Sequence, residues 1–177
     1  MLGKNLRNLP KIELHLHLDC CLSFDVVKKI NPKIDIETYN KKFKAPSTCS
    51  SVKEYIKCAE YAVDLMQDEK SISLIVEDLF DQLKAENIIY VEIRFAPLLH
   101  CRGELSSKEV VQIVDDICKK CSKKYGIHYA LILCTLRHFS KNQSMETVQL
   151  VEEFKNSGVF ALDIAADEAG FSLDNHF

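Results

Sequence analysis

Residues 10–23 read PKIELHLHLDCCLS. Apolar and polar residues alternate through KIELHLHL, which is the period of a β-strand that sends every second side chain to the same face. His15 and His17 are therefore expected to point the same way, with the carboxylates of Glu13 and Asp19 on that side. A core strand usually fills such positions with aliphatic residues, so this composition indicates a functional site.

Two neutral imidazoles at this spacing are able to bind one metal ion, for which Zn²⁺ is the first candidate. The plain alternative is a pair of core histidines bonded to backbone carbonyls. An H-x-H pair next to an acid, inside an apolar strand, favours the metal. A catalytic zinc generally has three protein ligands and an open position for water. His15 and His17 provide two ligands, and the others must come from elsewhere.

The rest of the chain alternates between helical and extended patterns. Nearly continuous apolar runs predict buried strands over 88–97, 127–138 and 159–168. Apolar residues three and four apart predict helices over 22–30, 51–66, 70–86, 106–124 and 143–156. The Lys-rich stretch before residue 50 is expected to be irregular. Ser106 and Glu109 predict a capping box, Ser50 or Ser51 an N-cap, and Gly158 a C-cap.

This β/α order predicts an α/β fold with a parallel sheet and right-handed crossovers, either a doubly wound open sheet or a (β/α) barrel. No glycine fingerprint follows the first strand, which weakens a dinucleotide site. Polar residues gather where the strands end, which in a barrel is the active-site face. They are His15, His17, Asp19, Arg94, Arg137, His138, Asp163, Asp167 and Glu168.

The composition limits the classes of function. A chain of 177 residues with 47% hydrophobic residues predicts one domain with a real core. A net charge of −3 and a pI near 6.1 give no broad basic field, so nucleic acid is not an expected partner. The apolar runs are too short to span a bilayer, and the N-terminus lacks the apolar stretch of a signal peptide. We therefore expect no membrane association and a cytoplasmic location.

Eight cysteines is a high count, but the chain is too long and too regular for a secreted disulfide scaffold. We expect reduced thiols, most of them at core-like positions. Cys118 and Cys121 form a C-x-x-C in the middle of a predicted helix, which does not indicate a redox motif.

PKIELHLHLD resembles the first strand of the adenosine deaminase family, within the metal-dependent amidohydrolase superfamily. The resemblance continues in the family's order through KAPSTCSSVKEYI, YVEIRFAPLLH, LILCTLRH and ALDIAADEAGF, and it covers essentially the whole chain. It implies a (β/α)8 TIM barrel, of which residues 1–177 hold the N-terminal half. That half would be a partial barrel of about four βα units, with extra helices after the first strand.

The resemblance also implies an activity, which is zinc-dependent hydrolytic deamination of adenosine or 2′-deoxyadenosine to inosine or 2′-deoxyinosine and ammonia. His15 and His17 match the family's first two zinc ligands. Asp19 matches the acid that hydrogen-bonds the 5′-hydroxyl of the ribose. Ala166 falls at a position, usually glycine, whose backbone N–H approaches a purine ring nitrogen. A purine nucleoside is thus the implied partner, and purine metabolism the implied setting.

The sequence departs from the family pattern in three respects. The family's later motifs are absent, among them the H-A-G-E block with a third zinc ligand and the proton-donating Glu, so we expect no catalytic residue in this chain. His176 lacks the context of a later ligand. Cys20 and Ala166 replace two glycines. At Cys20 the alternatives are a harmless substitution, strain near the substrate or an extra soft ligand. At Ala166 the backbone N–H remains a donor, and its methyl group either leaves the purine contact intact or crowds the ring.

Two other interpretations stay open. The first is a non-catalytic truncated or degenerate deaminase-like protein, whose open sheet edges bind a C-terminal half or a second copy. The second is another H-x-H metal hydrolase, such as a histidinol-phosphatase-like phosphoesterase. For Arg94 and Arg137, ion pairs inside the barrel are favoured over substrate contacts.

Overall fold

The strands predicted from the sequence form one parallel sheet. In the computed structural model, whose described residues are 8–176, β1 spans Lys11–His17 and continues into one turn of 3₁₀ helix, η1 (Leu18–Cys20). The other strands are β2 (Ile88–Phe95), β3 (His128–Leu136) and β4 (Val159–Ala165), and their order in the sheet is β1-β2-β3-β4. The expectation about a signal peptide rests partly on residues 1–7, which lie outside the described residues.

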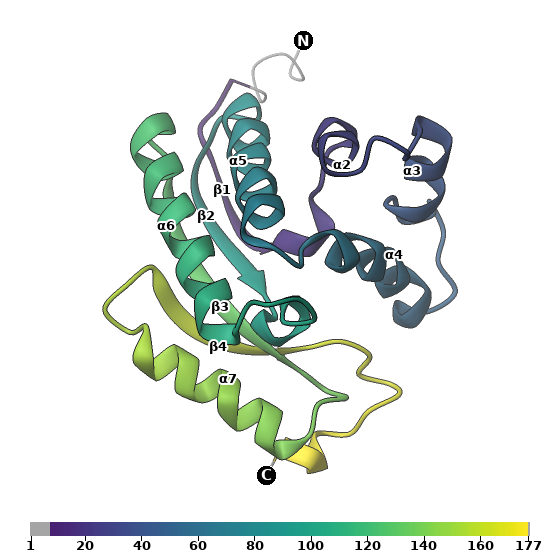
Figure 1. Ribbon diagram of the computed structural model, residues 1–177, viewed down its shortest axis with the longest axis vertical. Coiled ribbons are helices and arrows are strands. Elements are labelled where there is room, and N and C mark those ends of the chain that lie inside the picture. The colour runs from purple at the N-terminus through teal and green to yellow at the C-terminus, as the bar shows by residue number, and fades with distance from the viewer. Residues whose placement is uncertain (1–7, 177) are drawn as a thin grey trace.

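The helices form two groups. The bounds are α2 (Phe24–Ile30), α3 (Ile36–Lys42), α4 (Val52–Leu65), α5 (Glu69–Ala85), α6 (Ser107–Tyr125) and α7 (Lys141–Glu153), with 3₁₀ turns η2 (Pro97–His100) and η3 (Leu173–His176). In Figure 1, α5, α6 and α7 accompany the sheet, whereas α2, α3 and α4 lie together beyond the end of β1.

The strand order decides between the two predicted architectures. Each strand pairs with the one that precedes it in the chain, and every pair is parallel. A doubly wound sheet reverses its order at a switch point, whereas a barrel adds strands in one direction. The described chain is therefore a partial (β/α) barrel, as the family resemblance implies.

The helix starts follow their capping residues. Ser106 accepts from the backbone N–H of Glu109, whose carboxylate accepts from the N–H of Ser106 at 2.8 Å, so the predicted capping box is present. Ser51 caps α4 in the same way as Asp68 caps α5. These caps satisfy backbone donors that a helix leaves unpaired at its first turn.

Two local predictions were wrong. The stretch before residue 50 contains α3, capped by Asp35 and anchored by the buried Tyr39. A helix of two turns among lysines is too short to show a clear apolar period. Gly158 is not the C-cap of α7, which is Phe154. A Cβ at Gly158 would overlap the carboxylate of Asp115 and the ring of Tyr129, so close approach requires the glycine.

The core lies between the sheet and the helices α5 and α6. Val91, Ile93 and Phe95 alternate along β2, and Ile93 and Phe95 pair in register with Leu131 and Leu133 of β3. All five side chains are buried, and each such burial is worth about 2 kcal/mol. Because side chains alternate across a strand, the residues between them face the other side of the sheet. That other face carries the polar residues Glu92, Arg94 and Asp163.

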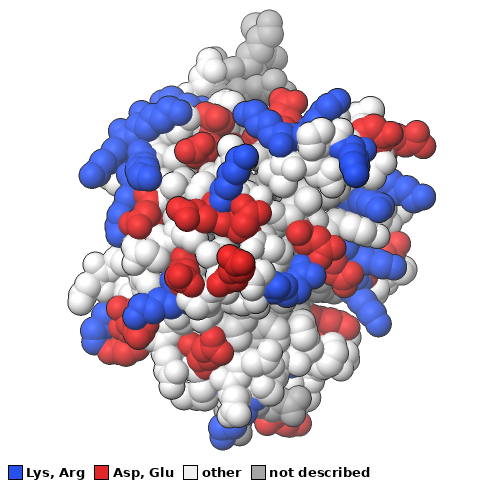
Figure 2. Space-filling view, viewed as in Figure 1, with Lys and Arg blue, Asp and Glu red and all other residues white. Residues whose placement is uncertain are grey.

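The outermost strands expose apolar side chains. Phe160 and Leu162 of β4 are exposed, Phe160 by 81%, as are Ile12 and Leu14 of β1. Over the face drawn in Figure 2, basic and acidic side chains are interspersed rather than segregated. Within residues 8–176, no helix has the length and apolar character needed to cross a membrane.

Candidate metal and nucleoside site

The two imidazoles predicted to bind metal lie side by side at the carboxyl end of β1. The ring centroids of His15 and His17 are 5.3 Å apart, and the ring planes make an angle of 42°. His15 is exposed and His17 is half-buried. Burial, reinforced by the nearby His15 and Arg94, lowers the pKa of His17. A lowered pKa favours the neutral imidazole, which is the form that binds metal.

A β-bulge in β1 contains Leu14 and His15. Glu13 pairs with Val91 and Leu16 with Ile93, so three steps along β1 match two along β2. The extra residue interrupts the regular ladder and changes the direction of the side chains around it. The backbone N–H of His15 donates to Oε1 of Glu13 at 2.9 Å. Local side-chain bonding thus replaces strand pairing at this point.

A cavity of about 460 Å³ opens beside the imidazoles. Its walls come from β1, from the turn after it and from α4, which contributes Tyr55; the lining residues are Glu13, His15, Leu16, His17, Cys20, Cys21 and Tyr55. Tyr55 is exposed and lines this cavity, and the sequence analysis did not single it out. The helical period of α4 gave no signal that would separate Tyr55 from a packing residue.

Asp19 lies in η1 and is only 8% exposed. Burial raises the pKa of its carboxyl to about 6. The thiol of Cys20 is placed to donate to Oδ1 of Asp19 at 3.7 Å between sulfur and oxygen. The acid predicted to bind the ribose therefore adjoins the cavity, whose wall is made by Cys20 and Cys21 rather than by Asp19 itself.

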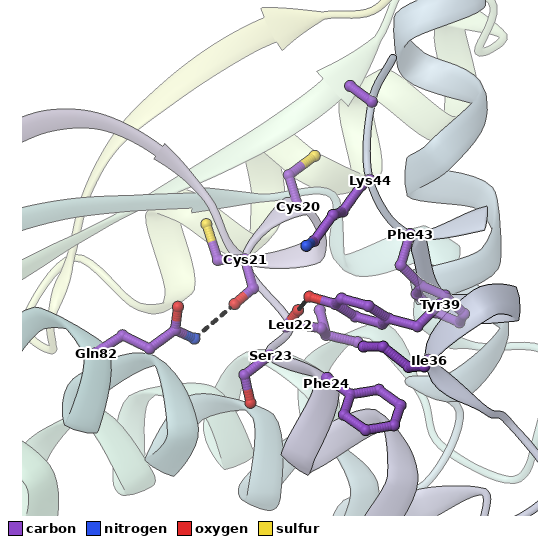
Figure 3. A pocket seen from close by; sticks show the side chains of 11 residues that line it. Cys20, Cys21, Leu22, Ser23, Phe24, Ile36, Tyr39, Phe43, Lys44 and Gln82 are labelled. Atoms are coloured by element: carbon purple, nitrogen blue, oxygen red, sulfur yellow. Dashed lines mark hydrogen bonds between the residues drawn. The ribbon is translucent and has the colours of Figure 1, made fainter. Parts of the chain in front are cut away.

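A second cavity of about 690 Å³ shares Cys20 and Cys21 with the first and extends between α2 and α3. Two of its polar side chains are engaged, as Figure 3 shows: the hydroxyl of Tyr39 donates to the carbonyl of Leu22, and the amide of Gln82 to the carbonyl of Cys21, both at 2.7 Å. These bonds hold the segment after β1 against α3 and α5. The smaller cavity is the one that contains the imidazoles.

Cys20 and Ala166, which stand where the family usually has glycine, differ in backbone conformation. Ala166, directly after β4, has φ +90°, a left-handed conformation that glycine adopts at little cost and alanine does not. Cys20 is not among the described residues with a positive φ. Backbone strain thus applies at Ala166 and not at Cys20. The next residue, Asp167, stabilises the turn by accepting from the N–H groups of Ala169 and Gly170.

Both arginines at strand ends form ion pairs, as the sequence predicted. Nη1 of Arg94 lies 2.7 Å from Oδ2 of Asp163, and Nη2 donates to the carbonyl of Leu14 at 3.1 Å. Arg137 pairs with Glu168 at 3.4 Å. These contacts tie together the strand ends that surround the candidate site.

His100 and His176 bond to other parts of the chain. His100 is buried and bonds the carbonyl of Met66 through Nδ1. His176 bonds Ser144 and the carbonyl of Arg137. All eight cysteines are free, and five of them are core residues or pack against the core: Cys118, Cys121 and Cys134 are buried, and Cys21 and Cys101 are partly buried. Burial raises the pKa of Cys121 to about 11, which does not suit a redox motif.

The donor set fits part of a zinc site. Two adjacent imidazoles, one of them biased towards its neutral form, supply the nitrogen ligands that zinc prefers. Among residues 8–176, no group of three or more His, Cys, Asp or Glu side chains is arranged to hold a metal ion.

A partial (β/α) barrel whose first strand ends in H-x-H is typical of the amidohydrolase class. A profile of the adenosine deaminase family matches residues 10–176, and the chain belongs to this family. Membership in this family does not support the phosphoesterase interpretation.

Curated relatives agree with this assignment. The chain is 35% identical to an adenosine deaminase of Clostridium acetobutylicum over 96% of its own length and 52% of the relative's. It is 36% identical to an adenosine deaminase of Clostridium perfringens, over 93% of this chain and 52% of that one. The chain therefore spans about half the length of the curated relatives it matches.

Solved structures share the fold. An adenine deaminase from Arthrobacter aurescens superimposes with a TM-score of 0.79 at 17% identity, over 94% of this chain and 52% of that one. The N6-methyl-AMP deaminase from Arabidopsis thaliana superimposes with a TM-score of 0.78 at 21% identity, over 97% of this chain and 53% of that one. An amidohydrolase from Burkholderia ambifaria, solved with bound Zn, superimposes with a TM-score of 0.81 at 15% identity, over 97% of this chain and 48% of that one.

Proposed function

We propose that residues 1–177 form the N-terminal half of a zinc-dependent deaminase barrel that converts adenosine or 2′-deoxyadenosine to the inosine product and ammonia. The observation that carries the proposal is the His15–His17 pair, with ring centroids 5.3 Å apart at the end of β1, in a chain of the adenosine deaminase family. His15 and His17 would hold the zinc. When bound, zinc supplies Lewis-acid activation of water for hydrolysis.

Two further residues would bind the nucleoside. Asp19 would accept a hydrogen bond from the 5′-hydroxyl of the ribose, and its pKa of about 6 leaves it mostly ionised near neutral pH. Ala166 would present its backbone N–H to a purine ring nitrogen. The cavity lined by both imidazoles is also lined by Cys20, the neighbour of Asp19 in the chain, which supports a nucleoside site beside the metal.

The rest of the site would come from residues outside this sequence. The chain covers 52% of its Clostridium acetobutylicum relative, and two imidazoles fall short of the three protein ligands usual for catalytic zinc. A C-terminal half, covalently continuous or separate, would supply the missing ligands and the proton donor. We place this activity in the cytoplasm, in purine metabolism.

The test is a chimera in which residues 10–176 replace the matched half of the Clostridium acetobutylicum adenosine deaminase. We expect adenosine to be converted to inosine, followed by ultraviolet absorbance. The same chimera with His17→Ala should be inactive, and with His128→Ala, an exposed histidine at the opposite end of a strand, fully active. A folded, zinc-loaded chimera without turnover would contradict the proposal.

The exposed outer strands suit the non-catalytic alternative as well as a barrel completed by a C-terminal half. Phe160 and Leu162 on one outer strand, and Ile12 and Leu14 on the other, are exposed apolar residues that a binding partner would cover. This alternative predicts association without zinc, whereas the proposed function predicts zinc binding by the imidazole pair.

A further inference from the structure

The peptide unit between Leu14 and His15 has both of its polar groups held by side chains. The N–H of His15 donates to Oε1 of Glu13 at 2.9 Å, and the carbonyl of Leu14 accepts from Nη2 of Arg94 at 3.1 Å. This peptide lies inside the β-bulge, where β1 is out of step with β2. A bulge leaves its extra residue without regular ladder partners. Glu13 and Arg94 therefore hold the part of β1 that strand pairing does not.

Arg94 is itself held firmly. Its Nη1 lies 2.7 Å from Asp163 of β4, whose other carboxylate oxygen accepts from the N–H of Ile164 at 2.8 Å. The Arg94 side chain is 11% exposed. A guanidinium is planar and rigid, so fixing one nitrogen on Asp163 fixes the direction of the other. The carbonyl of Leu14 is thus anchored, through Arg94, to the far strand of the sheet.

The position of this peptide controls where His15 points. His15 is exposed, so packing does little to fix its ring, and rotation of the preceding peptide would swing its Cβ. His17 lies one step beyond the bulge and pairs in register with Arg94. The same arginine therefore contacts the backbone before His15 and sits level with His17.

We propose that Glu13 and Arg94 are positioning residues that set the direction of His15 relative to His17 for metal binding. Neither side chain acts as a ligand. The inference rests on the proposed function, because it concerns the same imidazole pair. Outer-shell partners of metal ligands typically change metal affinity by 10- to 100-fold when they are removed.

The experiment is a titration of the full chain with Zn²⁺ alone, by equilibrium dialysis, together with the free energy of unfolding of each variant. We expect Arg94→Met and Glu13→Ala each to weaken zinc affinity by about tenfold. Glu13→Gln keeps an oxygen that accepts from the N–H of His15, so its affinity should stay near that of the unmodified chain. Arg102→Met is the matched control, because Arg102 also pairs with an aspartate at 2.7 Å but on the surface.

The possible outcomes distinguish failure of the positioning role from failure of the proposed function. Zinc binding by the unmodified chain, with unchanged affinity in Arg94→Met and Glu13→Ala, overturns the positioning role and leaves the proposed function intact. Loss of stability in these variants without loss of zinc affinity overturns it as well. Absence of zinc binding by the unmodified chain overturns the positioning role and leaves the proposed function, which takes its remaining ligands from residues outside this sequence, to be decided by the chimera. Should Arg94→Met fail to fold, Glu13→Ala, which leaves the ion pair in place, decides alone.

Discussion

Arg94 of β2 reaches past β3 to Asp163 of β4, with 2.7 Å between Nη1 and Oδ2. The Arg102–Asp64 pair has the same separation, but its side chains are 56% and 58% exposed, against 11% and 31% for Arg94 and Asp163. The two ion pairs therefore have equal separations but differ in their exposure to water. Water screens the surface pair, whereas loss of Asp163 would leave a mostly buried guanidinium without its counter-charge.

We predict that Asp163→Ala lowers the free energy of unfolding by about 2 kcal/mol, less than the 3–5 kcal/mol of a fully buried pair because Asp163 is partly exposed. Asp64→Ala should cost less than about 1 kcal/mol, as surface pairs do. Urea denaturation of both variants measures the difference. Equal losses would show that burial of Arg94 does not matter to this contact.

Ala166 adopts a backbone conformation that suits glycine, with φ +90°. We expect Ala166→Gly to raise the free energy of unfolding by about 0.5–1 kcal/mol, since relief of 1–2 kcal/mol of strain outweighs the added entropy of the unfolded chain. Ala165→Gly, one residue earlier and within β4, should instead lower it. Thermal or chemical unfolding checks both. A loss of stability in Ala166→Gly would mean that the left-handed turn is not strained.

His100 couples stability to pH. Burial lowers its pKa to about 4, from an ordinary value near 6.5. Between these values the unfolded chain binds a proton that the folded chain does not, so the free energy of unfolding falls as the pH falls. From pH 7 to pH 5 this one histidine should remove about 2 kcal/mol.

The measurement compares unfolding at pH 7 and pH 5 in His100→Gln and in the unmodified chain. On acidification, His100→Gln should lose about 2 kcal/mol less free energy of unfolding than the unmodified chain. His128→Gln, at an exposed position, should behave like the unmodified chain. Asp19 acts in the opposite direction, because its raised pKa makes the folded chain bind the extra proton, so only differences between variants isolate His100. If His100→Gln lost as much free energy of unfolding between pH 7 and pH 5 as the unmodified chain, the conclusion that His100 is buried in its neutral form would be wrong.

The outer strand β4 should mediate association. Phe160 is exposed by 81%, and removal of so large an apolar surface from water favours a partner or a second copy. We expect Phe160→Asp to shift the chain towards monomer in sedimentation experiments without lowering its free energy of unfolding. Ile36→Asp, an equally apolar exposed position on α3, is the control. The same self-association in both variants would exclude β4 as the contact surface.

Much of the fold could be predicted from the sequence because the patterns were local. The alternation in KIELHLHL predicted β1, and the apolar runs predicted β2, β3 and β4, although the runs extended past the ends of the strands. The choice of a barrel over an open sheet needed either the resemblance or the strand order. α3 was missed because a short helix among lysines carries almost no periodic signal.

The placement of the two imidazoles side by side could be predicted from the sequence, whereas the contacts that support them could not. The period of a strand was enough to place His15 beside His17. The bulge at Leu14, by contrast, depends on pairing with β2, and the contact from Arg94 comes from 80 residues away in the chain. Tyr55 was missed because its place beside the imidazoles depends on how α4 packs.

The most direct test of the account is the zinc content of the purified chain and of His15→Ala and His17→Ala, with His128→Ala as the matched control. We predict that the unmodified chain and His128→Ala bind zinc at one site with the same affinity. His15→Ala and His17→Ala should each lose at least tenfold in zinc affinity. Equal zinc binding in all four proteins, or none in any of them, would contradict the claim that His15 and His17 bind zinc within this chain.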